Sequence, residues 1–256
     1  VRVDAQLKAM NAIIDDITKI AAQLRDIYRD DLKKMRESER GAEASVTSSD
    51  MMHNVMNDEF YEMAHLGRMM VERFNGKQSK KKSKIPVEKM ELGQVAAIFG
   101  YSTQDYSKIN AQLRDPSKAD AGTTAYIDAA KQGLDRLPRF KGSVTRCDPS
   151  AEYFFDELVS TGVRTEAAFM SAGLKAVPGF GDVETFVKKV KTGKEITAFS
   201  LHEGEGEVLF PPGSAFKFVS FTGADGKKIK KIKDLKAAYP DGKSISKGVF
   251  EFKQIR

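Results

Sequence analysis

Residues 196–218 read ITAFSLHEGEGEVLFPPGSAFKF and join an acidic, glycine-rich segment to a strongly apolar one. Glu203, Glu205 and Glu207 alternate with glycine, so an extended backbone would carry all three carboxylates on one side. Like charges on one face repel each other, and a purely structural strand would avoid them. Glu207 leads directly into the apolar run 208–210, which predicts that it lies at the mouth of a buried strand. An acidic hairpin tip in water is the alternative interpretation.

The first part of the chain, up to residue 137, is predicted to be mainly helical. Apolar residues recur at helical spacing through residues 1–40, through 51–75, and again through 86–137 with a turn near 114–122. The basic stretch 77–84 is the best candidate for a linker. These features predict a helical N-terminal region over residues 1–85 and a second domain over residues 86–256.

After Phe140 the pattern changes to short runs rich in Phe, Val, Ile and Thr, separated by Gly and Pro. These runs are predicted to be strands; they cover residues 143–146, 168–172, 196–201, 207–210, 215–221 and 245–254. Helices are predicted to interrupt them near residues 151–160 and 182–191. Helices followed by a mostly antiparallel sheet indicate an α+β fold.

The composition excludes several classes of function. The chain has 256 residues, is 41% hydrophobic and can bury a substantial core. Its only cysteine is Cys147, and its three histidines lack ligand spacing, so no metal is expected. The net charge of +6 arises from 42 basic and 36 acidic residues that are intermixed, which does not favour a nucleic-acid partner. No apolar run is long enough to be a transmembrane segment. The first residues are not a signal peptide, so we expect a mature or trimmed form.

Three short segments carry a further signal because they occur in a fixed order. They are VTRCD at 144–148, FMSAG at 169–173 and EGEVLFPPG at 205–213. In this order they resemble the Arg, Ser and Glu-x-Glu signature of arginine-specific mono-ADP-ribosyltransferase toxins, in particular the clostridial binary-toxin-like group. The segment YSKINAQLR at 106–114 is similar to a helix that this family carries before the arginine. The resemblance covers about residues 90–256.

The resemblance implies a mixed, mostly antiparallel two-sheet ADP-ribosyltransferase core that uses NAD⁺ as a substrate and needs no metal. It implies that Arg146 binds the NAD⁺ pyrophosphate and that Ser171 holds Glu207 by a hydrogen bond. Glu207 would stabilise the oxocarbenium-like transition state through the ribose 2′-hydroxyl. Glu205 would orient the acceptor arginine, and Phe180 would lie against nicotinamide.

The resemblance also implies a partner and a location, namely an arginine-bearing host protein and secretion as a toxin or effector. A monomeric state is expected as well. The chain departs from the family pattern at Ala172 and Gly173, where the family carries Thr and Ser. The loss of these hydroxyls keeps open a second function, a NAD⁺ glycohydrolase with water as the main acceptor. A third alternative is a non-enzymatic binding protein with a degenerate transferase domain.

Overall fold

The computed structural model of the chain covers the predicted second domain and part of the helical region. The residues that the structure describes are 58–77, 85, 87–102, 106–176, 181–199 and 206–255. The helix expected over residues 1–40, the start of the helix expected over 51–75 and most of the expected linker lie outside these ranges.

The described chain begins with helices, as predicted. They are α3 (Asp58–Lys77), the 3₁₀ turn η1 (Val87–Lys89), α4 (Leu92–Gly100), α5 (Tyr106–Arg114), η3 (Pro116–Lys118) and α6 (Ala121–Arg136). The turn expected near 114–122 is confirmed, because η3 falls within it and Asp120 caps α6 by accepting a hydrogen bond from the Thr123 amide. None of the described helices is both long and apolar enough to cross a bilayer.

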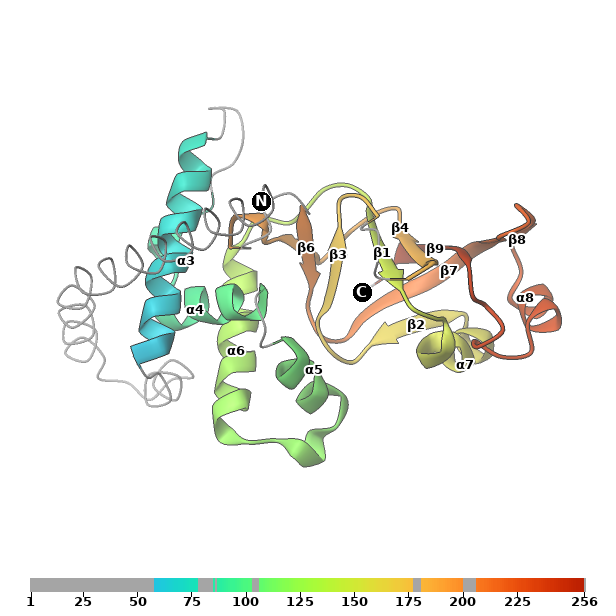
Figure 1. The fold of residues 1–256 in the computed structure, drawn as a ribbon, viewed down its shortest axis with the longest axis horizontal. Helices are drawn as coiled ribbons and strands as arrows, with labels where there is room; N and C mark the ends of the chain where they lie inside the picture. The colour runs from blue at the N-terminus through green and yellow to red at the C-terminus, as the bar shows by residue number, and fades with distance from the viewer. Residues whose placement is uncertain are drawn as a thin grey trace, which may run out of the picture.

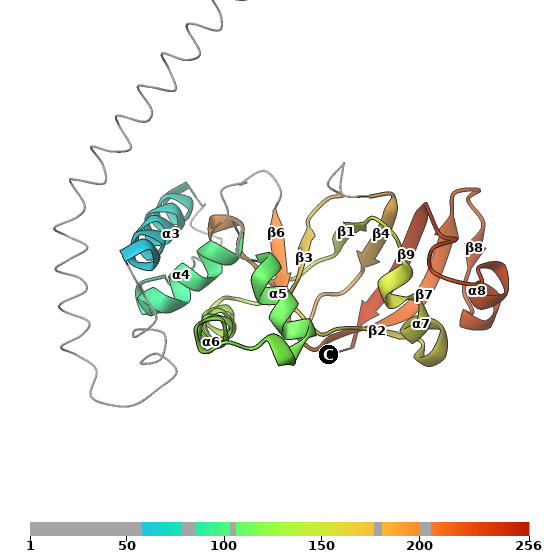
Figure 2. The ribbon, with the colours of Figure 1, turned by 60° about the horizontal axis from the view of Figure 1, so that its bottom comes forward.

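The later part of the chain forms the sheet. Its strands are β1 (Val144–Asp148), β2 (Val163–Glu166), β3 (Met170–Gly173), β4 (Val183–Val187), β5 (Lys194–Glu195), β6 (Glu207–Phe210), β7 (Ser214–Gly223), β8 (Lys228–Ile229) and β9 (Gly248–Gln254). Between them lie α7 (Glu152–Thr161), η4 (Thr197–Phe199) and α8 (Ile232–Ala238). Helices α3 to α6 gather beside β6, whereas α7 and α8 lie at the other end of the sheet (Figures 1 and 2).

The strands pair in the order β2-β7-β9-β4-β1-β3-β6-β5, with β8 added to β7. Among the described pairs only β4 and β9 run parallel. The expected α+β class with a mixed, mostly antiparallel sheet is confirmed. The two expected sheets are joined, because β1 and β3 pair through Thr145 and Gly173 and thereby connect both groups of strands into one path.

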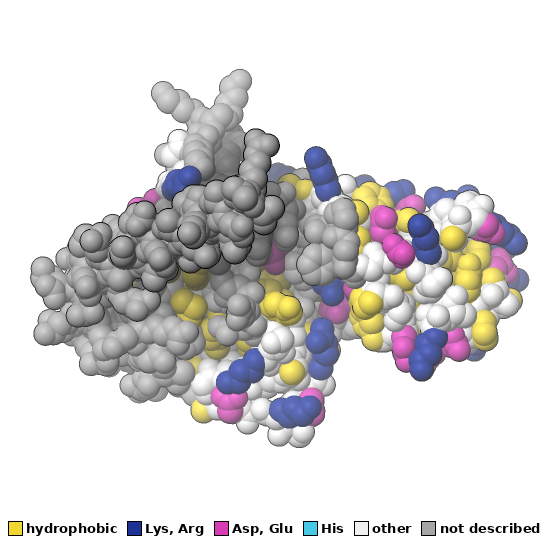
Figure 3. Space-filling view, in the orientation of Figure 1, with side chains coloured by type: hydrophobic (Ala, Val, Ile, Leu, Met, Phe, Trp, Pro, Cys, Tyr) yellow, Lys and Arg dark blue, Asp and Glu magenta, His cyan; other side chains and the backbone are white. Residues whose placement is uncertain are grey.

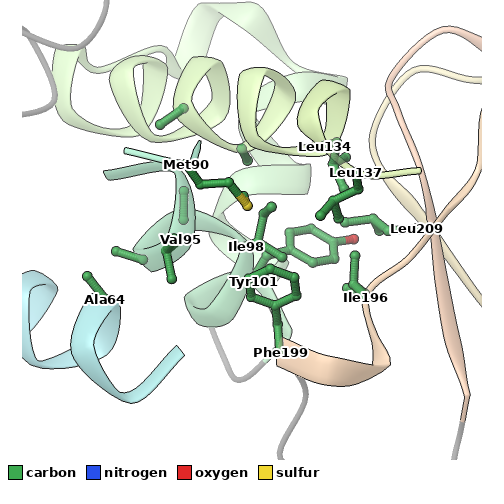
Figure 4. Packing of buried hydrophobic residues seen from close by; sticks show 14 of the residues in the cluster. Ala64, Met90, Val95, Ile98, Tyr101, Leu134, Leu137, Ile196, Phe199 and Leu209 are labelled. Atoms are coloured by element: carbon green, nitrogen blue, oxygen red, sulfur yellow. The ribbon is translucent and has the colours of Figure 1, made fainter. Parts of the chain in front are cut away.

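Two hydrophobic cores hold this arrangement together, and β6 contributes to both. Successive side chains of a strand point to opposite faces. Leu209 therefore joins the core built with the helices, whereas Val208 and Phe210 join the core inside the sheet. Figure 4 shows Leu209 of β6 among the residues of the first core, on the same side as Leu134 of α6 and Leu137. In the second core the ring of Phe210 packs edge-on against Phe216 of β7, with centroids 5.3 Å apart.

Two predictions of local structure were wrong. Residues 183–187 form strand β4 rather than part of a helix, and their burial follows the period of a strand, with Val183, Thr185 and Val187 buried. Residues 197–199 form the 3₁₀ turn η4 rather than a strand, since the Phe199 amide donates to the Ile196 carbonyl at 2.8 Å. Strands β2, β5 and β8 and helix α8 were not predicted.

Helix α3 packs against α4 and η4, and its Ala64 and Val71 lie in the same core as Val95 of α4. The predicted boundary between residues 85 and 86 therefore crosses a shared core within the described ranges. The division of the chain into residues 1–85 and 86–256 stays a prediction.

Candidate active site

A cleft of about 1040 Å³ lies where α5 and α7 face strands β1 and β3. This volume is at the upper end of the range for small-molecule sites, which suits a long ligand such as a dinucleotide. Its lining includes Tyr106 and Arg114 of α5, residues 145–148 of β1, residues 170–173 of β3, and Glu207.

Adjacent strands bring three of the predicted site residues together. The Arg146 Nη1 group donates a hydrogen bond to the Ser171 carbonyl oxygen at 2.8 Å. The Ser171 hydroxyl in turn donates to Glu207 Oε1 at 2.6 Å. These two hydrogen bonds favour a shared role for the three residues over the alternative that Ser171 is an ordinary strand serine and Arg146 a surface arginine. Arg146, Ser171 and Glu207 thus form one hydrogen-bonded chain along the wall of the cleft.

Gly206 sets the backbone just before Glu207. It has a φ of +60°, in the left-handed region that favours glycine. A Cβ atom there would also lie 2.7 Å from the Leu174 side chain, while the Gly206 carbonyl accepts a hydrogen bond from the Leu174 amide. The glycine before Glu207 therefore lets β6 begin where Glu207 pairs with Gly173 of β3.

Helix α5 forms the opposite wall. Tyr106, Asn110 and Arg114 are four residues apart, so they share one face of the helix, and all three line the cleft. Asn110 fixes the helix to the sheet, because its Oδ1 accepts from the Phe169 amide and its Nδ2 donates to the Tyr101 hydroxyl, both at 3.1 Å. Burial raises the pKa of Tyr101, so this hydroxyl stays protonated.

Behind Arg146 lies a group of charged residues that the sequence did not single out. The Arg146 Nε group donates to Asp148 Oδ1 at 2.6 Å, and Asp148 Oδ2 lies 3.1 Å from Nη1 of the fully buried Arg164. Arg164 Nε donates to Glu166 at 2.6 Å. One feature of the sequence could have indicated this group. Residues two apart on a strand share a face, so Arg146 lies on the same face as Asp148, and Arg164 on the same face as Glu166.

The pKa of Asp148 shows the effect of these neighbours. Burial acts to raise the pKa of the carboxyl, but the guanidinium groups of Arg164 and then Arg146 outweigh it and hold the pKa below its usual range. A depressed folded-state pKa stabilises the fold above the unfolded pKa of about 4, and this stability is lost as the pH falls through the folded value.

We expect Asp148→Asn to lower the free energy of unfolding at pH 7 by about 3 kcal/mol, because it removes the negative charge that Arg146 and Arg164 share. The difference from the parent protein should shrink as the pH falls below about 4. Thermal unfolding from pH 7 to pH 3 measures it. The exposed Asp234→Asn variant serves as the control. A difference that stays constant over this range would contradict the assignment.

Two predicted site residues, Phe180 and Glu205, lie outside the described residues, as does Glu203. Gly181, which follows Phe180, packs against the backbone of Asp148, and a Cβ atom there would overlap the Asp148 carbonyl oxygen. Within the described ranges, no three His, Cys, Asp or Glu side chains are grouped so that they could hold a metal ion. Cys147, the one cysteine of the sequence, belongs to the lining of the cleft.

Comparison with known proteins gives the family context. No protein family model matches the chain. It is 30% identical over 128 residues to the NAD(+)--protein-arginine ADP-ribosyltransferase Tre1 of Serratia proteamaculans, a match that covers 50% of this chain and 28% of that protein. It is 29% identical over 142 residues to the putative NAD(+)--arginine ADP-ribosyltransferase Mav of Mycobacterium avium, covering 54% of this chain and 17% of that protein. The matches therefore span less than a third of these relatives.

A solved structure with a similar fold is the type III effector XopAI from Xanthomonas axonopodis pv. citri, with a TM-score of 0.53 at 17% identity, covering 89% of this chain and 92% of that one. At this identity the likeness shows a shared fold. The sequence resemblance to arginine ADP-ribosyltransferases is confirmed by the named relatives.

Proposed function

We propose that the chain is a mono-ADP-ribosyltransferase that cleaves NAD⁺ at the nicotinamide–ribose bond and transfers ADP-ribose to an arginine side chain of a target protein. The observation that carries the proposal is the hydrogen-bonded chain from Arg146 through Ser171 to Glu207 on the wall of one cleft. The relatives named as arginine ADP-ribosyltransferases support the same reaction.

The chemistry needs a carboxylate at this position. When the bond between the nicotinamide nitrogen and ribose C1′ breaks, both electrons leave with the nitrogen, so nicotinamide departs neutral and the ribose becomes oxocarbenium-like. A fixed carboxylate stabilises this charge only as it develops, which raises the rate rather than only tightening substrate binding. Glu207 supplies the carboxylate, and the hydrogen bond from Ser171 fixes one of its oxygens. The acceptor guanidinium then bonds to C1′ and releases a proton.

The other roles follow from the resemblance and from residue chemistry. Arg146 binds the pyrophosphate, because a guanidinium offers several donors in one plane. Phe180 contacts nicotinamide, and Glu205 orients the acceptor guanidinium, whose fork matches a carboxylate.

Agmatine, a small amine that carries a guanidinium, tests the proposal. The protein is incubated with NAD⁺ with and without agmatine, and released nicotinamide and ADP-ribosyl-agmatine are both quantified. Transfer to agmatine supports the proposed function. Consumption of NAD⁺ without transfer would instead establish the glycohydrolase. This second candidate is favoured by Ala172 and Gly173, which line the cleft and carry no hydroxyl. No consumption of NAD⁺ would refute both.

We expect Glu205→Gln to lower the rate of transfer to agmatine by about a hundredfold, because the acceptor loses a charged partner. The rate of NAD⁺ hydrolysis should change little, since Glu207 remains. Parallel assays of ADP-ribosyl-agmatine and of free ADP-ribose measure the transfer rate and the hydrolysis rate separately. Glu203→Gln is the matched control from the same acidic run and should leave both rates unchanged. If both rates fall together in Glu205→Gln, Glu205 serves the cleavage step instead.

The remaining parts of the proposal concern partners and location. We infer an arginine-bearing host protein as the target, secretion as a bacterial toxin or effector, and a monomeric state. Figure 3 shows basic and acidic side chains interspersed over the described part of one face, which suits a protein without a nucleic-acid partner. Labelled NAD⁺ with a host lysate would identify the target, and size-exclusion chromatography with light scattering would test the monomeric state.

A further inference from the structure

The group of buried charges behind Arg146 has Arg164 at its centre. Arg164 is fully buried and uses all three of its nitrogens: Nε on Glu166, Nη1 on Asp148 and on the Thr185 hydroxyl, and Nη2 on the Tyr153 hydroxyl. Its guanidinium also lies over the Phe154 ring, 4.2 Å from the centroid. A side chain bound on every donor group has little freedom to move.

The strand order shows that this contact requires a curved sheet. Arg164 lies on β2 and Asp148 on β1, and β7, β9 and β4 separate these strands in the sheet order. In a flat sheet, four strand spacings would put them roughly 19 Å apart. The 3.1 Å contact between Arg164 and Asp148 therefore joins two distant parts of a rolled sheet directly beside the cleft.

The charges of this group balance, with two guanidiniums and two carboxylates among the half-buried Arg146 and the buried Asp148, Arg164 and Glu166. Stability alone does not account for them, because well-packed apolar residues commonly stabilise a fold as well as a buried ion-pair group does. What the charges do provide is orientation. Asp148 accepts a hydrogen bond from Arg164 on Oδ2 and one from Arg146 on Oδ1. The position of the Arg164 guanidinium therefore determines the position of the carboxylate, which in turn orients Arg146.

The orientation of Arg146 determines which of its donors face the cleft. Of its five N–H bonds, one is used by Asp148 and one by the Ser171 carbonyl. The other three have no hydrogen-bond partner among the residues that the structure describes. A planar guanidinium held at two points presents the remaining donors in a fixed direction.

We infer that Arg164 is a positioning residue: acting through Asp148, it holds the Arg146 guanidinium so that its remaining donors point into the cleft toward an anionic ligand. The inference rests on the proposed function only in naming NAD⁺ as that ligand. Arg164 itself is fully buried and is not part of the cleft lining.

Arg164→Lys tests this, because lysine keeps the charge but cannot place donors on Glu166, Asp148 and Tyr153 at once. The hydrogen exchange of Arg146 Nε–H is followed by ¹⁵N NMR, with the signal assigned by its loss in Arg146→Lys. We expect exchange to become about tenfold faster, the equivalent of losing one charge-assisted hydrogen bond. Thr185→Val, which removes one hydroxyl from the same group, should have a smaller effect of the same sign and remains informative if Arg164→Lys does not fold.

The matched control is Lys194→Met. It removes another buried cation, one that donates to the Leu137 carbonyl and does not line the cleft. This variant should lose stability and leave exchange at Arg146 unchanged. Unchanged exchange in both Arg164→Lys and Thr185→Val, or an equal increase in Lys194→Met, would overturn the inference.

A double-mutant cycle on NAD⁺ affinity supplies the functional readout. Arg164→Lys should weaken NAD⁺ binding about tenfold in the parent protein, in line with the lost hydrogen bond. In the Arg146→Lys background it should have no further effect, and an equal loss in both backgrounds would overturn the role through Arg146. Failure of the parent protein to bind NAD⁺ would refute the proposed function, whereas the exchange measurement would still decide whether Arg164 positions Arg146.

Discussion

Glu207→Gln is expected to lower the rate of nicotinamide release by about a thousandfold, equivalent to about 4 kcal/mol of transition-state stabilisation. Glutamine has nearly the same shape as glutamate. It keeps an oxygen that can accept the hydrogen bond from Ser171, which is 2.6 Å long to Glu207 in the parent protein. The negative charge is lost, and the second carboxylate oxygen is replaced by an NH₂ group that donates rather than accepts. The effect therefore isolates the electrostatic stabilisation of the ribose cation from the packing of β6.

The rate is measured as nicotinamide released at saturating NAD⁺, with thermal unfolding recorded on the same samples. Glu195→Gln is the matched control, because Glu195 lies on β5 and pairs with Val208 of β6 but does not line the cleft. We expect the control to keep its activity and both variants to remain folded. If Glu207→Gln keeps more than about a tenth of the parent rate, Glu207 does not carry the electrostatic role assigned to it.

The order of helices and strands was predictable because local periodicity is strong in most segments. The helix over 121–136 is long enough, and the strand at 207–210 apolar enough, for the sequence pattern to indicate the correct element in each case. Segment 183–190 was ambiguous, since Val183, Phe186, Val187 and Val190 also fit helical spacing. Its parallel pairing with β9, a contact with residues more than 60 positions away, decides in favour of a strand.

The site was predictable where residue order carries information. Arg146, Ser171 and Glu207 were identified as a set by their order and flanking residues, although 25 and 36 positions separate the bonded pairs. Arg164 gave no such signal, because arginine in a short strand usually indicates an exposed face. Its burial depends on the curvature of the whole sheet, which no local pattern encodes. The roles of Arg146, Ser171 and Glu207 stay predictions, as do those of Glu205 and Phe180, which rest on the resemblance alone.

Arg146→Lys is expected to lower kcat/KM for NAD⁺ by about a hundredfold, or about 2.7 kcal/mol, mainly through a higher KM. Lysine keeps the positive charge but concentrates its donors at one point. It cannot contact Asp148 Oδ1, the Ser171 carbonyl and a pyrophosphate oxygen in the geometry that the guanidinium provides. Steady-state kinetics of nicotinamide release measure both constants. The exposed Arg139→Lys variant, seven residues upstream, is the control and should match the parent protein.

The division between KM and kcat separates two roles that Arg146 could have. A residue that binds the pyrophosphate equally in the ground state and the transition state changes KM and leaves kcat nearly unchanged. Arg146 also contacts the backbone of Ser171, whose hydroxyl holds Glu207. If kcat falls a hundredfold while KM stays constant, Arg146 acts by supporting Ser171 and Glu207, and the pyrophosphate must be bound elsewhere. A loss in both constants would show that this one guanidinium binds the substrate and also keeps the catalytic carboxylate in place.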